Sequence, residues 1–195
     1  MRVEILKEKL VLDGFFRVKE ALLRHEKFNG QMTPPLRRLR FLRPPAAACL
    51  PYDPERREIV LVEQFRWPPY SVGDPGWLWE IPAGIVAEGE DPAECMKREL
   101  REEAGLEVAE LEPVLTYFST PGTTTEKIYL YFARVSTAGL EGRVGGAEEE
   151  NEDIRVHVLS YEEAWRKVQE GVIRDGKTLL ALLLLRERER EGGKA

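Results

Sequence analysis

The sequence has few of the residues that bind zinc or form disulfides. Its 195 residues include only two cysteines, Cys49 and Cys95, and two histidines, His25 and His157. A structural zinc site needs four nitrogen or sulfur ligands at short spacings, which this set does not supply. Any bound metal is therefore expected to have oxygen ligands. We expect both cysteines to be small buried core residues, and His157, which alternates with apolar neighbours, to be structural.

Long apolar runs and an excess of positive charge are also absent. The longest apolar stretch, residues 179–185, is far shorter than the ~20 residues of a membrane-spanning helix, and the N-terminus has no signal-peptide pattern. The 35 acidic and 29 basic residues give a net charge of −6, so nucleic acid and membranes are not expected partners. We therefore expect a cytoplasmic protein. The low amide content, two Asn and three Gln, favours a thermophilic source.

Residues 3–43 are expected to form a small sheet. Apolar and charged residues alternate in three runs separated by turn-forming residues, and the runs cover residues 3–12, 15–24 and 36–42. This pattern predicts a three-stranded antiparallel sheet. Because its core would be too small for independent stability, we expect residues 1–43 to be a dimerisation extension, followed by one main domain at residues 44–195.

The main domain alternates predicted strands with predicted helices. Strand signals cover residues 46–50, 58–66, 78–81, 114–118, 127–135 and 154–159. The clearest helix starts after the capping residue Asp91, has Pro92 at its first position, and ends at Gly105. Two more helices are expected, from Ser160 to about residue 170 and from about residue 178 to 191. This order predicts an α/β (α+β) domain with a mixed β-sheet.

The first predicted helix carries an acidic face. Glu99, Glu102 and Glu103 are spaced i, i+3 and i+4, which places them on one side of the helix, while Met96 and Leu100 belong to the opposite apolar side. Like charges at this spacing destabilise an isolated helix by about 0.2–0.5 kcal/mol per pair. A bound divalent cation would compensate for this repulsion, and a merely solvated acidic surface is the alternative.

A longer pattern surrounds this helix. Gly84 is followed by five residues, Glu90, seven residues and then the string Arg-Glu-Leu-Arg-Glu-Glu-Ala-Gly-Leu at residues 98–106. This pattern resembles the Nudix box, and residues 84–106 fill every fixed position of it. The resemblance implies a Nudix hydrolase, with a mixed β-sheet sandwiched between helices. In that family the box forms a loop-helix-loop that holds Mg²⁺ or Mn²⁺ against a substrate diphosphate.

The resemblance also implies metal ligands. They are Glu99 and Glu103, supported by Glu102 and by the backbone carbonyl of Ala83. Carboxylate and carbonyl oxygens suit Mg²⁺, which keeps several waters and often takes further ligands from substrate phosphates. Arg98 is expected to orient the glutamates.

Segments outside the box resemble the ADP-ribose pyrophosphatase branch of this family. They are residues 63–66, 79–84, 119–126 and 150–158. Pro121 also follows Leu106 by fifteen residues, a spacing that is associated in the family with ADP-ribose specificity. The resemblance implies a homodimeric, metal-dependent enzyme that hydrolyses ADP-ribose, a nucleoside diphosphate derivative, to AMP and ribose 5-phosphate.

The same resemblance implies substrate-binding roles. Arg66 would contact a substrate phosphate, Glu126 a ribose hydroxyl, and Thr120 the region of the ribose. Each has an ordinary alternative, which is a strand end for Arg66 and Glu126 and turn formation for Thr120. Three tryptophans are candidates for stacking a base or, alternatively, for core packing: Trp67, Trp77 and Trp79.

Catalytic roles fall on the acidic run of residues 148–153. Resemblance to the ADP-ribose pyrophosphatases implies Glu150 as the general base and Glu152 as an additional metal ligand. Glu102 is the next candidate for the base. A solvated acidic turn is the alternative for this run.

Other substrates and one other class of function stay open. Residues 173–178 resemble the GDP-mannose pyrophosphatases equally well, so GDP-mannose, another nucleotide sugar or FAD are alternative substrates. A sensor that binds ADP-ribose without cleaving it is a remote alternative, because such a protein would lack box carboxylates and carry a basic DNA-binding module. The sequence has no Gly-Lys-Ser/Thr phosphate loop and no nucleophile elbow, which argues against kinases, GTPases and serine hydrolases.

Overall fold

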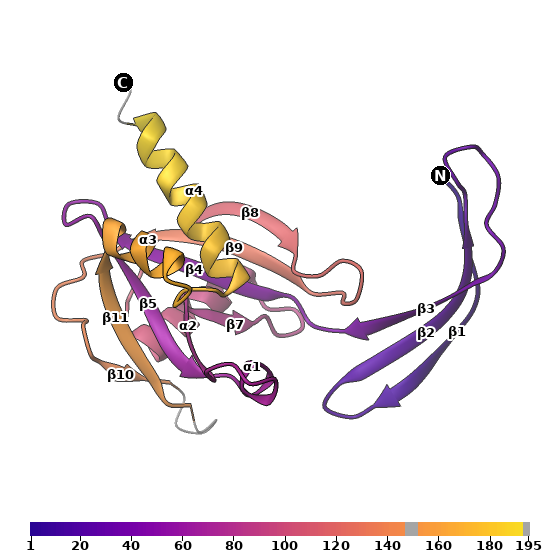
Figure 1. The fold of residues 1–195 in the computed structure, drawn as a ribbon, viewed down its shortest axis with the longest axis horizontal. Coiled ribbons are helices and arrows are strands. Elements are labelled where there is room, and N and C mark those ends of the chain that lie inside the picture. The colour runs from indigo at the N-terminus through magenta and orange to yellow at the C-terminus, as the bar shows by residue number, and fades with distance from the viewer. Residues whose placement is uncertain (147–151, 193–195) are drawn as a thin grey trace. The chain divides into compact units, whose positions relative to one another are not determined.

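A computed structural model describes residues 1–146 and 152–192 of the chain. The chain divides into two compact units (Figure 1). Unit 1 comprises Met1–Pro45 and Tyr117–Lys127, and unit 2 comprises Ala46–Thr116 and Ile128–Ala195. Unit 1 therefore contains the expected N-terminal extension together with a segment from much later in the chain.

Unit 1 is built on a three-stranded antiparallel sheet. Its strands are β1 (Val3–Asp13), β2 (Arg17–His25) and β3 (Leu36–Leu42), in the order β1-β2-β3. The predicted three-stranded extension is confirmed, although β2 begins at Arg17 because Phe15 and Phe16 belong to the turn before it. Near the end of β3, the backbone of Phe41 exchanges hydrogen bonds with the Thr123 carbonyl and the Thr125 N–H, at 2.9 and 3.1 Å.

The sheet of unit 1 leaves many apolar side chains exposed. Ile5 is 65% exposed, Leu12 is 52% and Leu39 is 55%. The register places Leu12 and Leu39 on one face of the sheet and Ile5 on the other, so apolar side chains are exposed on both faces.

The larger sheet has eight strands. They are β4 (Ala46–Asp53), β5 (Glu58–Phe65), β6 (Trp77–Glu80), β7 (Ala83–Ile85), β8 (Glu112–Phe118), β9 (Lys127–Arg134), β10 (Val144–Gly145) and β11 (Ile154–Ser160). The main order is β10-β11-β5-β4-β9-β8, with β6 beside β5 and β7 beside β4. Strands β4 and β9 are parallel, whereas β4 pairs antiparallel with β5 and β7. The predicted mixed sheet is confirmed.

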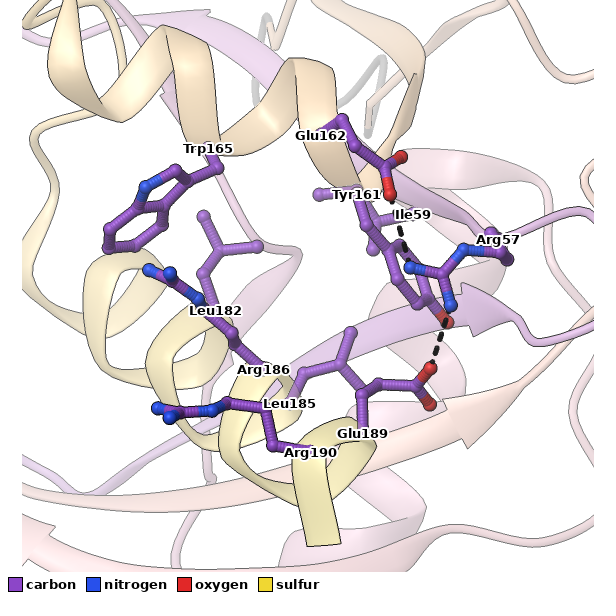
Figure 2. Close-up of a pocket in the computed structure, with 10 residues that line it drawn as sticks. All are labelled: Arg57, Ile59, Tyr161, Glu162, Trp165, Leu182, Leu185, Arg186, Glu189 and Arg190. Atoms are coloured by element: carbon purple, nitrogen blue, oxygen red, sulfur yellow. Dashed lines mark hydrogen bonds and ion pairs between the residues drawn. The ribbon is translucent and has the colours of Figure 1, made fainter. Parts of the chain in front are cut away.

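Four helices complete the described chain. They are α1 (Trp67–Ser71), α2 (Pro92–Ala104), α3 (Tyr161–Gln169) and α4 (Gly176–Gly192). Met96 and Leu100 of α2 share a buried core with Val60 of β5. The preceding residue of β5, Ile59, lies beside α3 and α4 instead (Figures 1 and 2). Because neighbouring residues of a strand point to opposite faces, the helices cover both faces of the sheet, as predicted.

Three short elements were not predicted, namely α1, β7 and β10. Each has five residues or fewer, which is too short for a hydrophobic period to be recognised. Within residues 1–146 and 152–192, no helix combines the length and apolar character needed to cross a membrane. Both cysteines are buried and unpaired, as expected of core residues.

Candidate active site

Helix α2 is fixed by caps at both ends. A carboxylate oxygen of Asp91 accepts hydrogen bonds from the backbone N–H groups of Ala93 and Glu94, at 2.8 and 3.3 Å. At the other end, Gly105 adopts a left-handed conformation with φ of 64°, and its N–H donates to the carbonyl of Arg101. The helix therefore begins and ends where the sequence predicts, and its carboxylates have defined positions.

The three carboxylates of α2 differ in burial. Glu102 is exposed and Glu99 is partly buried, whereas Glu103 is only 2% exposed. Glu103 follows Leu100 by three residues, so part of its side chain lies on the same side of the helix as the core residues. The prediction of an acidic face wholly opposite the apolar stripe is therefore wrong for Glu103.

The pKa of the Glu103 carboxyl group is raised to about 8, chiefly by burial. The negative charges of Glu99 and Glu152 contribute to this rise, while a hydrogen bond from the Ala83 N–H, at 3.1 Å, and the charge of Arg66 oppose it. Burial also raises the pKa of Glu99, against the lowering effect of the adjacent Arg98. Carboxylates of α2 and of the segment before β11 thus act on one another electrostatically.

Strand β7 brings the backbone close to these carboxylates. A Cβ atom placed on Gly84 would lie 2.0 Å from the carboxylate carbon of Glu99, so a side chain at this position would displace Glu99. Gly84 is held there because β7 pairs with β4, where Gly84 lies opposite Ala47. The structure therefore brings Ala83, Gly84, Glu99 and Glu103 together.

This set of groups fits a hard divalent cation. It offers only oxygen donors. The pKa values of Glu99 and Glu103 are raised because nearby positively charged side chains do not compensate for the burial of these carboxylates and the negative charges around them. Among the residues that the structure describes, no group of three or more His, Cys, Asp or Glu side chains is close enough to form a metal cage. Mg²⁺ does not need such a cage, because it commonly binds one or two carboxylates together with waters and substrate phosphates.

Arg98 contacts three carboxylates of the same loop and helix. Its guanidinium group lies 3.6 Å from Glu90, 2.8 Å from Glu99 and 3.0 Å from Glu102. One cation therefore ties the loop before α2 to two successive turns of the helix. Such contacts orient the glutamates.

Arg66 lies at the end of β5 and forms a second charged cluster. Its guanidinium group donates two hydrogen bonds to Glu80 of β6, at 2.9 and 3.1 Å. Lys177 of α4 also pairs with Glu80, and with Asp175 at 3.1 Å. Glu80 is only 3% exposed, and the charges of Lys177 and Arg66 outweigh the effect of burial and lower its pKa to about 2.

Sequence reasoning missed Glu80 and Lys177 as site residues. The only signal for Glu80 is a charged residue that directly follows the apolar strand segment Trp77–Trp79. Lys177 lies 97 positions away from Glu80, so no local pattern connects them.

The tryptophans fall into two groups. The ring of Trp79 stacks on His157 at 4.1 Å between centroids, and Lys167 lies 5.9 Å from the same ring. His157 also pairs with Glu63 at 2.9 Å, which is a structural role. Trp67 and Trp77 are 64% and 50% exposed, so they alone of the three candidates present large open ring surfaces.

Thr120 and Glu126 belong to unit 1. The Thr120 carbonyl accepts hydrogen bonds from the N–H groups of Thr123 and Thr124, both at 3.0 Å, which is turn chemistry. Glu126 accepts hydrogen bonds from Arg43, at 3.0 and 3.1 Å, and from Ser119 at 2.7 Å. The structure thus brings Glu126 together with Ser119 and Arg43, neither of which the sequence singled out.

The predicted general base, Glu150, lies outside the described residues. Glu152 is described, and its charge contributes to the raised pKa values of Glu99 and Glu103. Of the acidic run, the structure therefore connects Glu152 with the carboxylates of α2.

Known proteins resemble the chain over most of its length. The chain is 42% identical over 180 residues to the ADP-ribose pyrophosphatase of Escherichia coli strain K12. This alignment covers 92% of this chain and 86% of that protein. Identity to the ADP-ribose pyrophosphatase of Haemophilus influenzae is 37% over 184 residues, covering 92% and 84%. Identity to the GDP-mannose pyrophosphatase of Cronobacter sakazakii is 33% over 183 residues, covering 93% and 94%.

A similar solved structure and a matching family model agree with these sequence similarities. A crystal structure of an ADP compounds hydrolase superposes with a TM-score of 0.74, covering 100% of this chain and 98% of that one at 21% identity. The family model for the NUDIX domain matches residues 42–182, which include all of α2 and the residues around it. The chain therefore belongs to the NUDIX family.

Proposed function

We propose that this protein is a divalent-cation-dependent pyrophosphatase that hydrolyses ADP-ribose to AMP and ribose 5-phosphate. The observation that carries the proposal is that Glu99 lies against Gly84, that Glu103 accepts a hydrogen bond from the Ala83 N–H, and that the charge of Glu152 acts on both carboxylates. Two of the relatives described above are ADP-ribose pyrophosphatases that match more than nine-tenths of the chain.

The cation would be held by Glu99 and Glu103, with Glu152 and the carbonyl of Ala83 as further oxygen donors. When bound, Mg²⁺ or Mn²⁺ neutralises diphosphate charge and lowers the pKa of water. Glu150 is the proposed general base, which takes a proton from the attacking water, and Glu102 is the next candidate. Water adds to one phosphorus, the bridging P–O bond breaks, and the second phosphate leaves with its sugar.

Arg66 is proposed to bind the substrate phosphates. Its side chain is 39% exposed, and Glu80 holds its guanidinium group through two hydrogen bonds. A bidentate arginine held in this way presents its remaining donors in a fixed direction, which suits a phosphate. In unit 1, Glu126 and Thr120 are proposed to contact the ribose.

Metal-dependent catalysis is tested by replacing the carboxylates of α2 one at a time. Glu103→Gln and Glu99→Gln should each lower kcat by ~10³, because the charge that holds the cation is removed while the shape of the side chain is kept. Glu94→Gln is the matched control, since Glu94 is exposed on the same helix and its carboxylate pairs with Lys97, at 2.9 Å. Activity within a few-fold of the parent in both test variants would refute the assignment of this helix.

The substrate is tested with a panel of ADP-ribose, GDP-mannose and FAD in the presence of Mg²⁺, with products separated by chromatography. We expect kcat/KM for ADP-ribose to exceed that for GDP-mannose by at least ~10-fold. A reversed ranking would assign the protein to the nucleotide-sugar group, to which the Cronobacter sakazakii relative belongs by name.

The proposed enzyme is a homodimer located in the cytoplasm. Exposed apolar residues on one face of the sheet of unit 1 supply the proposed interface, among them Leu12 and Leu39. The buried, unpaired thiols of Cys49 and Cys95 suit a reducing compartment. A thermophilic source is proposed from the amide-poor composition alone.

A further inference from the structure

A pocket lies between helices α3 and α4, and it shares no residue with the site described above (Figure 2). Its volume is about 480 Å³, within the range of pockets that hold small molecules. The lining includes Ile59 of β5, which belongs to the sheet face away from α2. A ligand here would therefore be separated by the sheet from the carboxylates of α2.

The middle of the pocket is apolar. Ile59, Leu182 and Leu185 form its floor, and they are 0%, 7% and 3% exposed (Figure 2). Trp165 of α3 stands at one end as a partly buried aromatic wall. Because Ile59, Leu182 and Leu185 are almost fully covered by their neighbours, the open apolar surface of the pocket includes the partly exposed rings of Trp165 and Tyr161.

The two ends of the pocket differ in charge. At one end, Arg57 is balanced by Glu162 and Glu189, each at 3.1 Å (Figure 2). At the opposite end, the guanidinium group of Arg186 lies over the ring of Trp165, at 4.3 Å from its centroid. In the part of the chain that the structure describes, Arg186 pairs with no carboxylate, so this end of the pocket carries an unbalanced positive charge.

Arg57 holds the two helices at a fixed separation. It bridges Glu162 at the start of α3 and Glu189 near the end of α4, and its guanidinium group covers the ring of Tyr161 at 5.0 Å. Its φ of 55° lies in the left-handed region, which is unfavourable for a residue with a side chain. The bridge between the helices gives a reason for an arginine in a turn where glycine would be relaxed.

We infer that this pocket binds a small amphipathic anion, that is, an apolar chain or ring that carries one carboxylate or one phosphate group. The apolar body lies against the ring of Trp165, above the buried Leu182 and Leu185, and the anionic group pairs with Arg186. Charge complementarity selects this class, because Arg186 would repel a cation and would remain without a carboxylate or phosphate partner beside a neutral molecule. The chain as a whole has a net charge of −6, so attraction of an anion to this place is local.

The test uses the full-length, nitrogen-15-labelled chain and follows its tryptophan indole N–H signals by NMR. The chain has four tryptophans, so the signals of Trp67, Trp77 and Trp79 serve as internal references for Trp165, which a Trp165→Phe variant assigns. Octanoate and octyl phosphate are titrated separately, with octanol as the neutral probe of the same chain length. The Trp165 signal should move selectively, and the better of the two anions should bind at least ~10-fold more tightly than octanol.

Two variants of α4 locate the anionic group. Arg186→Gln should weaken binding of the better anion by about tenfold. Arg188→Gln is the matched control and should leave binding unchanged, because Arg188 lies two residues further along the helix and pairs with Glu112 at 2.8 Å, outside the pocket. The ranking of octanoate and octyl phosphate identifies the head group. The inference is overturned if Trp165 moves no more than the reference signals up to ~10 mM anion, if octanol binds equally well, or if the two arginine variants behave alike.

Discussion

Gly84→Ala should separate the activity of this protein from its stability. A Cβ atom at this position would lie 2.0 Å from the Cδ and Oε1 atoms of Glu99, whereas ordinary contacts begin at 3.4 Å. The carboxylate of Glu99 must therefore move by about 1.4 Å, which follows from 3.4 minus 2.0 Å. Displacement of a reacting or ligating group by ~1 Å costs about 100-fold in rate, so we expect kcat to fall by ~10².

Stability should change little in the same variant. The group that must move is the end of a flexible side chain, and no positive φ is involved at Gly84. Rates of ADP-ribose hydrolysis and thermal unfolding should both be measured at saturating Mg²⁺. Gly14→Ala is the control, because a Cβ there meets nothing within 4 Å. Full activity in Gly84→Ala would refute the placement of Glu99 at the catalytic centre, and a large loss of stability would show that the backbone, not the carboxylate, had moved.

Three further predictions concern charge and assembly. The pKa of Glu80 is lowered from 4.5 to about 2, so its ionised carboxylate stabilises the fold by about 3 kcal/mol above pH 4.5. This stabilisation is lost as the pH falls through 2. Glu80→Gln should therefore show a weaker dependence of urea unfolding on pH between about 6 and 2.5, and an unchanged dependence would contradict the ion pairs. Glu150→Gln should lower kcat by ~10² to 10⁴ with little change in Mg²⁺ dependence, whereas Glu152→Gln should also raise the Mg²⁺ concentration for half-maximal rate. A near-parental kcat for Glu150→Gln would transfer the base role to Glu102. Deletion of residues 1–43 should give a monomeric or unstable, poorly active protein, and light scattering that shows the intact chain as a monomer at micromolar concentration would contradict the proposed dimer.

Local signals explain why α2 could be predicted almost to the residue. Asp91, Pro92 and Gly105 act within one turn of the helix ends, so their effects are visible in the sequence itself. The same holds for the strands of unit 1, where alternation and turn residues mark β1, β2 and β3. In these segments, local preference and tertiary structure agree.

Tertiary contacts explain what the sequence did not predict. Strand β7 has only three residues and exists because it pairs with Ala46–Ala48 of β4. The burial of Glu103 depends on how closely α2 approaches the sheet. The position of Glu103 within the helix does not by itself reveal this burial. The cluster of Glu80 and Lys177 joins residues from β6 and α4, which no spacing rule connects.

Two equally buried glutamates show what distinguishes the candidate catalytic centre from its supports. Glu80 and Glu103 are 3% and 2% exposed, yet the pKa of Glu80 is lowered to about 2 and that of Glu103 is raised to about 8. Burial acts in the same direction on both, so the difference lies in the neighbours: Lys177 and Arg66 for Glu80, and the carboxylates of Glu99 and Glu152 for Glu103. A paired buried carboxylate such as Glu80 stabilises the fold. A buried carboxylate that faces other carboxylates costs stability, and a chain retains such a residue where an external cation is to be bound.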